Sequence, residues 1–128
     1  MAEQKSNPGT FCWYELMTSD TNVAREFYTK LFGWETTEMP MQGGTYTMFK
    51  NGDKDVCGMM AITKEMGDIP PHWMAYIEVE DVDAAVRKVE ELGGKISYPP
   101  TDIPNIGRFA CITDPTGAAI SLFTGKKD

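Results

Sequence analysis

The sequence predicts an α+β domain made of two β-α-β-β-β modules, which together form a curved, cup-like sheet of eight strands with the helices outside. Two observations lead to this prediction. A pattern of strand, helix, glycine and strand occurs twice, so that Asp20 matches Asp81 and Leu31 matches Leu92 with a constant offset of 61 residues. Turn sequences rich in Gly, Pro, Asn and Asp then divide the chain after each helix into three strands.

Module one covers about residues 10–63. It opens with an apolar and aromatic strand over 11–17, and a helix follows because apolar residues recur at helical spacing. These are Val23, Ala24, Phe27, Tyr28 and Leu31. Asp20 is placed to cap the first amides of this helix, and Gly33 can adopt the left-handed turn that ends it. Three further strands are predicted, over 34–38, 46–50 and 56–62.

Module two covers about residues 73–125 and follows a connector, 64–72, that is rich in Gly and Pro. It repeats the first pattern, with a strand over 73–79, Asp81 as the helix cap and Gly94 as the matching glycine. The apolar helix positions are Val82, Ala85, Val86, Val89 and Leu92. The last three strands are predicted over 95–98, 108–113 and 119–123. Neither module can bury its sheet alone, so we expect the two to pair, within one chain or by exchange between two.

Composition indicates a single soluble domain over residues 1–128, with 41% hydrophobic residues and a net charge of −7. The negative charge argues against nucleic acid as a partner, because phosphate backbones would be repelled. No apolar run suits a signal peptide or approaches the ~20 residues of a membrane helix, so we expect a cytoplasmic protein with no membrane partner. The three cysteines form no C-x-x-C pair and are expected to be buried thiols.

Several strings of residues resemble one known family from Thr10 to Phe123. They are Trp13-Tyr-Glu-Leu-Met-Thr-Ser-Asp20, Ala24-Arg-Glu-Phe-Tyr-Thr-Lys-Leu-Phe-Gly-Trp34, Cys57-Gly-Met-Met60, Asp81-Val-Asp-Ala-Ala85, Leu92-Gly-Gly94 and Gly107-Arg-Phe-Ala-Cys-Ile-Thr-Asp-Pro-Thr-Gly-Ala118. The resemblance is to the glyoxalase, bleomycin-resistance and extradiol-dioxygenase (vicinal oxygen chelate) superfamily, and within it to the glyoxalase-like single-domain branch. It implies the cup of paired modules and a chain that commonly forms a homodimer.

The resemblance also implies where a metal would be held. Catalytic members bind one metal ion through His, Gln or Glu side chains on the first and last strand of each module. Those positions fall here on Trp13, Met74, Ser121 and either Gly58 or Met60. None is a suitable ligand, because an indole only donates and a thioether is a soft, weak donor. We therefore expect no metal, no cofactor and no metal-dependent glyoxalase or dioxygenase activity.

The lone histidine, His72, is expected to mark the entrance of a strand and to hydrogen-bond the backbone there, and not to bind a metal.

Strand alternation predicts the side chains that face the cup. On the first strand Tyr14 and Leu16 should lie under the helices, while Trp13, Glu15 and Met17 look inward. The candidate ligand-binding residues are Trp13, Glu15, Met60, Met74, Tyr76, Arg108, Ser121 and Phe123. The aromatic rings suit a planar group, the methionines an irregular shape and the carboxylates a cation. These side chains could instead fill the cup as core, and Arg108 could form a structural salt bridge.

Three functions remain open. The first is a metal-free protein that binds and sequesters an organic or cationic small molecule. The second is a glyoxalase-like enzyme, catalysing a lyase, isomerase or hydrolase step with Glu15 or Glu78 as a general base whose pKa burial raises. The third is a dimeric interaction or regulatory protein in which the cup is incidental.

Overall fold

The computed structural model describes residues 6–41 and 44–126, and it divides into two compact units. One unit is Trp13–Met74, and the other joins the chain from Ala75 onward to the N-terminal residues up to Cys12. Each unit is described by itself, with module one used for β1 to β4 and α1 and module two for β5 to β8 and α2.

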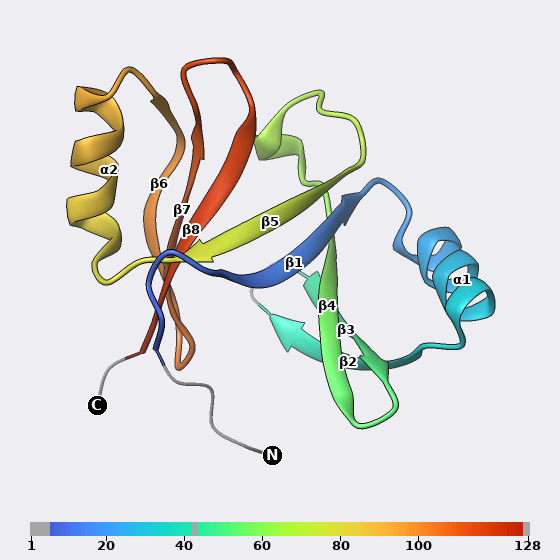
Figure 1. Cartoon of the computed structure of the whole chain (residues 1–128). Coiled ribbons are helices and arrows are strands. Elements are labelled where there is room, and N and C mark those ends of the chain that lie inside the picture. Colours follow the sequence, from blue (N-terminus) through green and yellow to red (C-terminus); the bar gives the residue numbers. More distant parts are fainter. Residues whose placement is uncertain (1–5, 42–43, 127–128) are drawn as a thin grey trace. The chain divides into compact units, whose positions relative to one another are not determined.

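Module one contains a mixed four-stranded sheet and one helix (Figure 1). Its elements are β1 (Phe11–Thr18), α1 (Thr21–Phe32), β2 (Glu35–Met41), β3 (Gly44–Asn51) and β4 (Lys54–Ala61). The strand order is β2-β3-β4-β1, in which β1 runs parallel to β4 and the other neighbours are antiparallel. The parallel pair is the expected result of a connection that passes through the helix and two further strands before it returns.

Module two repeats this arrangement after the connector, which contains a short 3-10 helix, η1 (Lys64–Met66). Its elements are β5 (His72–Glu78), α2 (Val82–Glu91), β6 (Lys95–Ile103), β7 (Gly107–Thr113) and β8 (Ala119–Gly125), in the order β5-β8-β7-β6. The predicted strand 95–98 proved too short, because β6 continues through Pro99 and Pro100 to Ile103. An outer strand needs only one edge of its backbone for pairing, so prolines are tolerated there, and its register against β7 shifts beside them.

The helix caps follow the predictions with one exception. Asp20 accepts a hydrogen bond from the Val23 amide at 3.1 Å, and Asp81 accepts one from the Asp83 amide at 3.0 Å. Gly33 ends α1 with a left-handed φ of 75°, as expected. In module two the left-handed glycine is Gly93, with φ 92°, and not Gly94.

The reason for Gly94 is its close approach to other atoms. A Cβ at this position would lie 2.8 Å from the Thr113 carbonyl oxygen and 2.8 Å from Val89 Cγ1. The repeated glycine thus ends a helix in module one and allows close packing between helix and strand in module two.

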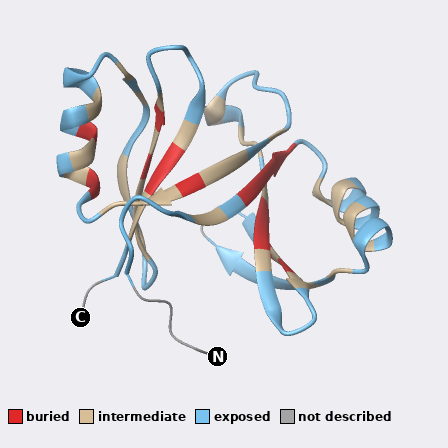
Figure 2. Cartoon of the chain, in the orientation of Figure 1, coloured by how far each residue is buried: buried red, intermediate tan, exposed pale blue. Residues whose placement is uncertain are grey.

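Each helix covers one face of its own sheet, but the two helices do so to different extents (Figure 2). In module two, Val82 and Val86 of α2 are buried against Ala110, Ile112 and Leu122. In module one, the buried core is Leu16, Phe49, Cys57 and Met59, with Ala24 and Tyr28 of α1 packed against it. No residue of α1 is itself buried.

Part of the apolar run of α1 does not pack on the sheet. Val23, Phe27 and Leu31 are 66%, 58% and 57% exposed. These three residues are spaced by four and lie along one side of α1. Ala24 and Tyr28, which contact the core, lie along another side, because the directions of successive side chains on a helix differ by ~100°. Tyr14, expected under the helix, is also exposed.

The α+β fold class of two β-α-β-β-β modules is confirmed, with eight strands and two α-helices in the part of the chain that the structure describes. His72 begins β5, and its Nδ1 lies 2.9 Å from the carbonyl oxygen of Pro70, as expected for a residue at a strand entrance. Over residues 6–41 and 44–126, no helix has the length and apolar character needed to cross a membrane. The three cysteines are free thiols: Cys57 is buried, whereas Cys12 and Cys111 are only partly so.

Candidate functional site

The sheet of module one has one face toward α1 and one face away from it. Leu16 of β1 and Met59 of β4 belong to the core under α1. Because neighbouring side chains on a strand alternate, the residues on either side of these two point to the other face, which we call the α1-distal face. It carries Trp13, Glu15 and Met17 from β1, Tyr46 and Met48 from β3, and Gly58 and Met60 from β4.

Three polar side chains on the α1-distal face form a hydrogen-bond network. Trp13 Nε1 donates to the Tyr46 hydroxyl at 2.9 Å, and that hydroxyl donates to the Glu15 carboxylate. Glu15 is buried, with 8% of its surface exposed. A carboxylate is rarely buried without a partner, so the phenol offsets part of the cost of removing Glu15 from water.

The ionisation of Tyr46 is strongly perturbed. Burial is the main cause that raises the pKa of Tyr46, and the neighbouring Glu15 carboxylate raises it further, while the Trp13 N–H acts in the opposite direction. The phenol therefore keeps its proton across the physiological range and serves as a hydrogen-bond donor to Glu15.

The Tyr46 ring lies over Gly58, which is paired in register with Glu15 on β1 and with Met48 on β3. A Cβ at position 58 would collide with the phenol oxygen and with the ring carbon that bears it. The absence of a side chain at Gly58 is thus what leaves room for Tyr46 beside Glu15.

The corresponding face of module two is mainly apolar. Tyr76 and Ser121 face each other across β5 and β8, and both are buried. The Ser121 hydroxyl lies 3.1 Å from Cys111 Sγ, and the Tyr76 ring centroid lies 6.5 Å from that of Phe109. Phe123 is placed on the same face by its register with Glu78.

Two charged candidates are engaged within module two. The Glu78 carboxylate accepts hydrogen bonds from the Ser6 hydroxyl at 2.7 Å and from the Asn7 amide at 3.1 Å, so it anchors the N-terminal segment. Arg108 donates to both carboxylate oxygens of Asp83, at 2.9 and 3.1 Å, and to Asp102 at 2.9 Å. The hydrogen bond from Arg108 is the main reason that the pKa of Asp83 is lowered. Arg108 therefore forms the structural salt bridge that the sequence left open.

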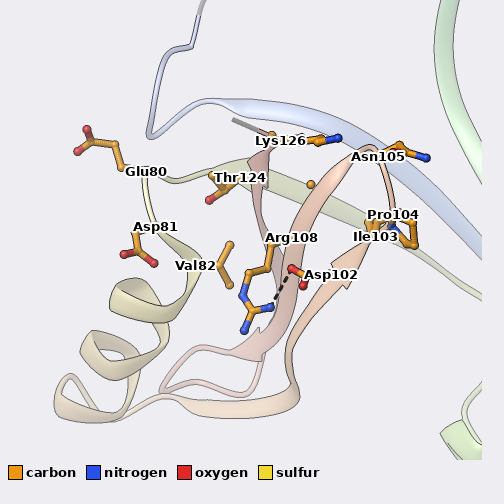
Figure 3. Close-up of a pocket in the computed structure, with 12 residues that line it drawn as sticks. Glu80, Asp81, Val82, Asp102, Ile103, Pro104, Asn105, Arg108, Thr124 and Lys126 are labelled. Carbon is orange, nitrogen blue, oxygen red and sulfur yellow. Dashed lines mark hydrogen bonds and ion pairs between the residues drawn. The ribbon is translucent and has the colours of Figure 1, made fainter. Parts of the chain in front are cut away.

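A shallow pocket of about 470 Å³ lies at the end of module two where α2 begins (Figure 3). Glu80, Asp81, Asp102, Arg108 and Lys126 supply its charges. Figure 3 shows Arg108 directed toward Asp102, so its guanidinium is already used. Of the predicted ligand-binding residues only Arg108 lines this pocket, which therefore differs from the predicted binding surface.

The family resemblance is confirmed by direct comparison. The model of the Glyoxalase/Bleomycin resistance protein/Dioxygenase superfamily matches residues 10–122. The chain belongs to this superfamily. Among curated relatives, CFP32 of Mycobacterium tuberculosis, provisionally named a glyoxylase, is 40% identical over 93% of the chain. The anthracycline biosynthesis protein DnrV of Streptomyces peucetius is 33% identical over 91%. The chain spans about half the length of these relatives, 47% of each.

Solved structures show the same superfamily fold at low sequence identity. Methylmalonyl-CoA epimerase from Mycobacterium tuberculosis is similar with a TM-score of 0.65 and 20% identity, over 99% of this chain and 94% of that one. The Mn(II)-bound glyoxalase from Novosphingobium aromaticivorans gives a TM-score of 0.62 and 17% identity, over 97% of this chain and 43% of that one. At such identities the likeness concerns the fold alone.

The structure decides which residue of β4 corresponds to Ser121 of β8. At the offset of 61 residues Tyr76 matches Glu15, and Tyr76 pairs with Ser121 whereas Glu15 pairs with Gly58. Gly58 is therefore the counterpart of Ser121, and Met60, paired with Met17, is the counterpart of Phe123.

The side chains at the four metal-ligand positions do not suit a divalent metal ion. Gly58 has no side chain, and the Trp13 indole has only an N–H, which is bound to Tyr46. Met74 offers a thioether, and the Ser121 hydroxyl is paired with Cys111. Among the residues that the structure describes, no group of three or more His, Cys, Asp or Glu could hold a metal ion.

Sequence reasoning found Trp13 and Glu15 but missed Tyr46 and Gly58 as parts of one site. Alternation was applied to the first, fifth and eighth strands only. Applied to 46–50, with Phe49 as the core residue, it would have placed Tyr46 on the face of Glu15. No sequence signal links Tyr46 to Gly58, because their contact depends on the register of β3 against β4.

Proposed function

We propose that this chain binds a small organic molecule on the α1-distal face of module one without the aid of a metal ion. The observation that carries the proposal is the Trp13–Tyr46–Glu15 network, which holds a buried carboxylate beside two aromatic side chains on the sheet face away from the helix core. A polar centre of this kind within an apolar surface is typical of small-molecule sites.

The remaining side chains of this face suit an organic ligand. Met48 and Met60 are only partly buried, and flexible thioethers adapt to irregular shapes. The Trp13 and Tyr46 rings offer aromatic surface for a planar group. The net charge of −7 adds a long-range attraction for a cationic ligand.

The names of relatives suggest a first probe. DnrV is named for anthracycline biosynthesis, and the superfamily name includes bleomycin resistance. Daunorubicin combines a planar ring system with a protonated amine, so it matches both the aromatic and the acidic parts of the face. It is also fluorescent, which allows direct titration.

The proposal is tested by titrating the full chain with daunorubicin. Trp13→Leu should weaken binding about tenfold, which corresponds to about 1.4 kcal/mol of lost ring contact. Trp73→Leu is the matched control, because Trp73 is half-exposed on the α1 side, where its indole donates to the Tyr28 hydroxyl at 3.3 Å. Equal losses in the two variants, or no binding by the wild type, would contradict the proposal.

A catalytic role for Glu15 is the second candidate, because a shielded carboxylate held by a phenol can act as a general base. The two functions differ in the fate of the probe. A binding protein returns daunorubicin unchanged by mass spectrometry. An enzyme converts it in a reaction that Glu15→Gln abolishes while binding persists.

We further propose that a second copy of the chain covers the exposed stripe of α1, formed by Val23, Phe27 and Leu31. The patch is on the order of 400 Å², within the range of functional patches and about half of what each partner buries in a standard interface. The basic side chains of α1 are paired, Arg25 with Glu38 and Lys30 with Glu26, so this surface adds no net charge to oppose self-association of a chain of net charge −7.

Native mass spectrometry and light scattering test the dimer. The wild type should be dimeric and Phe27→Lys monomeric, because Lys would place a charge in the apolar contact. Leu92→Lys, at a 70% exposed position beyond α2, should stay dimeric. A monomeric wild type would refute the dimer, and a dimeric Phe27→Lys would refute this surface. The same spectrum reports any tightly bound divalent metal, which would contradict metal-free binding.

A further inference from the structure

We infer that Asn51, at the end of β3, is a site of spontaneous covalent modification, where water replaces the side-chain amide and leaves aspartate or isoaspartate. Asn51 is followed by Gly52 in the turn that joins β3 to β4, and both residues are exposed (Figure 1). The inference concerns this hairpin and is independent of the proposed ligand site and of the proposed dimer.

The turn between β3 and β4 consists of Gly52 and Asp53, with Asn51 and Lys54 paired across its ends. Gly52 has a left-handed φ of 65°, whereas Asp53 does not have a left-handed φ. A positive φ at only the first of the two central residues is typical of a type II′ turn, which favours Gly at that place. The pairing of the strands therefore ends at Asn51, and the Gly52 amide lies outside it.

The two groups that would react are not engaged elsewhere. Among residues 6–41 and 44–126, neither the Asn51 side-chain amide nor the Gly52 N–H has a hydrogen-bond partner. A Cβ at position 52 would have no atom outside the adjoining residues within 4 Å, so the turn is open to water. No side-chain contact has to break before the Gly52 nitrogen approaches Asn51 Cγ.

The reaction begins with ring closure between these adjacent residues, which makes the step intramolecular. The Gly52 nitrogen loses its proton to a base in the solvent and attacks Asn51 Cγ. A bond between this nitrogen and Cγ forms, the Cγ–Nδ2 bond breaks, and Nδ2 takes up a proton and leaves as ammonia. The product is a cyclic succinimide.

Water then opens the succinimide at either of its carbonyl carbons. Attack at Cγ gives aspartate, and attack at the backbone carbonyl carbon gives isoaspartate, in which the main chain continues through the former side chain. Overall, water is consumed and ammonia is released, without oxidation or reduction.

The other asparagines of the sequence, Asn7, Asn22 and Asn105, are internal comparisons, because in each the nitrogen of the next residue is not available. Asn7 precedes Pro8, whose nitrogen carries no proton to lose. Asn22 precedes Val23, whose amide donates to the Asp20 carboxylate at 3.1 Å.

Asn105 gives the sharpest comparison, because it is exposed and lies in a turn with a left-handed φ of 68°. The amide of the next residue, Ile106, donates to the Ile103 carbonyl oxygen at 2.9 Å. The branched Cβ of Ile106 also crowds its own nitrogen. Exposure and a left-handed turn are thus shared with the Asn51–Gly52 turn, whereas the accessible nitrogen is not.

The two products should affect the hairpin differently. Aspartate keeps the length of the main chain and places a carboxylate opposite Lys54. Isoaspartate lengthens the main chain beside a two-residue turn, so the pairing of Asn51 with Lys54, and the 3.3 Å salt bridge of Lys50 with Asp55 next to it, should be lost. A register shift between Phe49 and Lys50 separates these pairs from the core, so the change should stay at the end of the hairpin.

The test is incubation of the full chain at pH 7.4 and 37 °C, followed by digestion with pepsin at low pH and mass spectrometry. The peptide with Asn51 should become about 1 Da heavier. Its rate should exceed the rates at Asn22 and Asn105 at least about tenfold, because their next residues are β-branched and hydrogen-bonded. The rate should rise with pH, since the attacking nitrogen must first lose its proton.

Two controls separate the turn from the rest of the chain. Asn51→Gln keeps a side-chain amide but would have to close a larger ring, so its peptide should keep its mass. In urea that unfolds the chain, the amides of Val23 and Ile106 lose their partners, and the advantage of Asn51 over Asn22 and Asn105 should narrow. Native Asn51 that keeps its mass while the unfolded chain reacts there would overturn the inference, as would equal native rates at the three positions.

Limited digestion with trypsin tests the effect of isoaspartate. Cleavage after Lys54 should be about threefold or more faster in the isoaspartyl form, separated from the incubated protein by ion exchange, than in the fresh wild type, because local opening exposes the chain to the protease. Asn51→Asp reproduces the other product and should be cleaved at the rate of the fresh wild type. Equal cleavage of the isoaspartyl form and Asn51→Asp would overturn the predicted opening of the hairpin.

Discussion

Tyr46→Phe is the substitution that most directly tests the network on the α1-distal face. It removes one oxygen and leaves the ring over Gly58, so no cavity contributes to the result. The buried Glu15 carboxylate loses a hydrogen bond, and the Trp13 N–H loses its acceptor at 2.9 Å. A hydrogen bond to a charged group contributes about 1.5–3 kcal/mol and a neutral one about 1 kcal/mol, so the free energy of unfolding should fall by about 2–4 kcal/mol.

Urea unfolding followed by far-UV circular dichroism measures this loss. With a slope of about 2 kcal/mol per molar urea, the midpoint should fall by roughly 1–2 M. Tyr98→Phe is the control, because Tyr98 is 44% exposed, and the change in unfolding free energy should stay within about 0.5 kcal/mol. A double-mutant cycle with Glu15→Gln should give a coupling energy of at least about 1 kcal/mol, as expected for contacting residues.

The same pair of proteins makes a prediction about pH. The folded state raises the pKa of Tyr46 above the value of 10.0 for an isolated tyrosine. The stabilising effect is therefore complete below pH 10 and declines as the pH rises above 10, where unfolding would release the proton. The difference between wild type and Tyr46→Phe should shrink above pH 10. A midpoint unchanged by Tyr46→Phe at pH 7, together with zero coupling to Glu15, would refute the network.

Three further predictions concern other parts of the chain. Burial raises the pKa of Cys57 to about 11, so this thiol should not react with Ellman's reagent at pH 8 until the chain unfolds, and fast labelling in the native state would contradict its placement. Gly94→Ala should lower the melting temperature, because the added Cβ would lie too close to the Thr113 carbonyl oxygen and to Val89. Gly93→Asn should be tolerated, because Asn can adopt a left-handed φ. A larger loss of melting temperature in Gly93→Asn than in Gly94→Ala would refute these roles. Arg108→Met should lower the melting temperature at pH 7. Because pairing with Arg108 lowers the pKa of Asp83, the stabilisation should be complete above pH 4 and should disappear as the pH falls and Asp83 becomes protonated. A difference in melting temperature between wild type and variant that does not depend on pH would contradict the ion pair.

The sequence predicted most of the local structure because each signal acts over a few residues. Asp20 and Asp81 cap helices through side chains that reach only the next turn, so their role is readable from position alone. The strands were located by apolar runs and turn residues, with errors mainly at their ends. The continuation of β6 through two prolines was missed because tolerance of proline depends on having a neighbour on one side only.

The candidate site was predicted in part for the same reason. Alternation along β1 put Trp13 and Glu15 on one face, and the structure brings them together through Tyr46. Glu78, with the same parity on β5, instead anchors Ser6 and Asn7, because the N-terminal segment lies against that strand. The alternation of side chains along a strand predicts which face of the sheet a residue lies on, but it does not predict which other segment of the chain contacts that face.

By itself the sequence determined the repeated β-α-β-β-β modules, the superfamily and the lack of suitable side chains at the metal-ligand positions, because these depend on residue types at fixed spacing. Only the tertiary structure decided that Gly58, and not Met60, is the counterpart of Ser121, and that the Tyr46 phenol lies over it beside Glu15. Those facts follow from the register of β4 against β1 and β3. Register is set by hydrogen bonds between strands distant in sequence, and no local pattern records it.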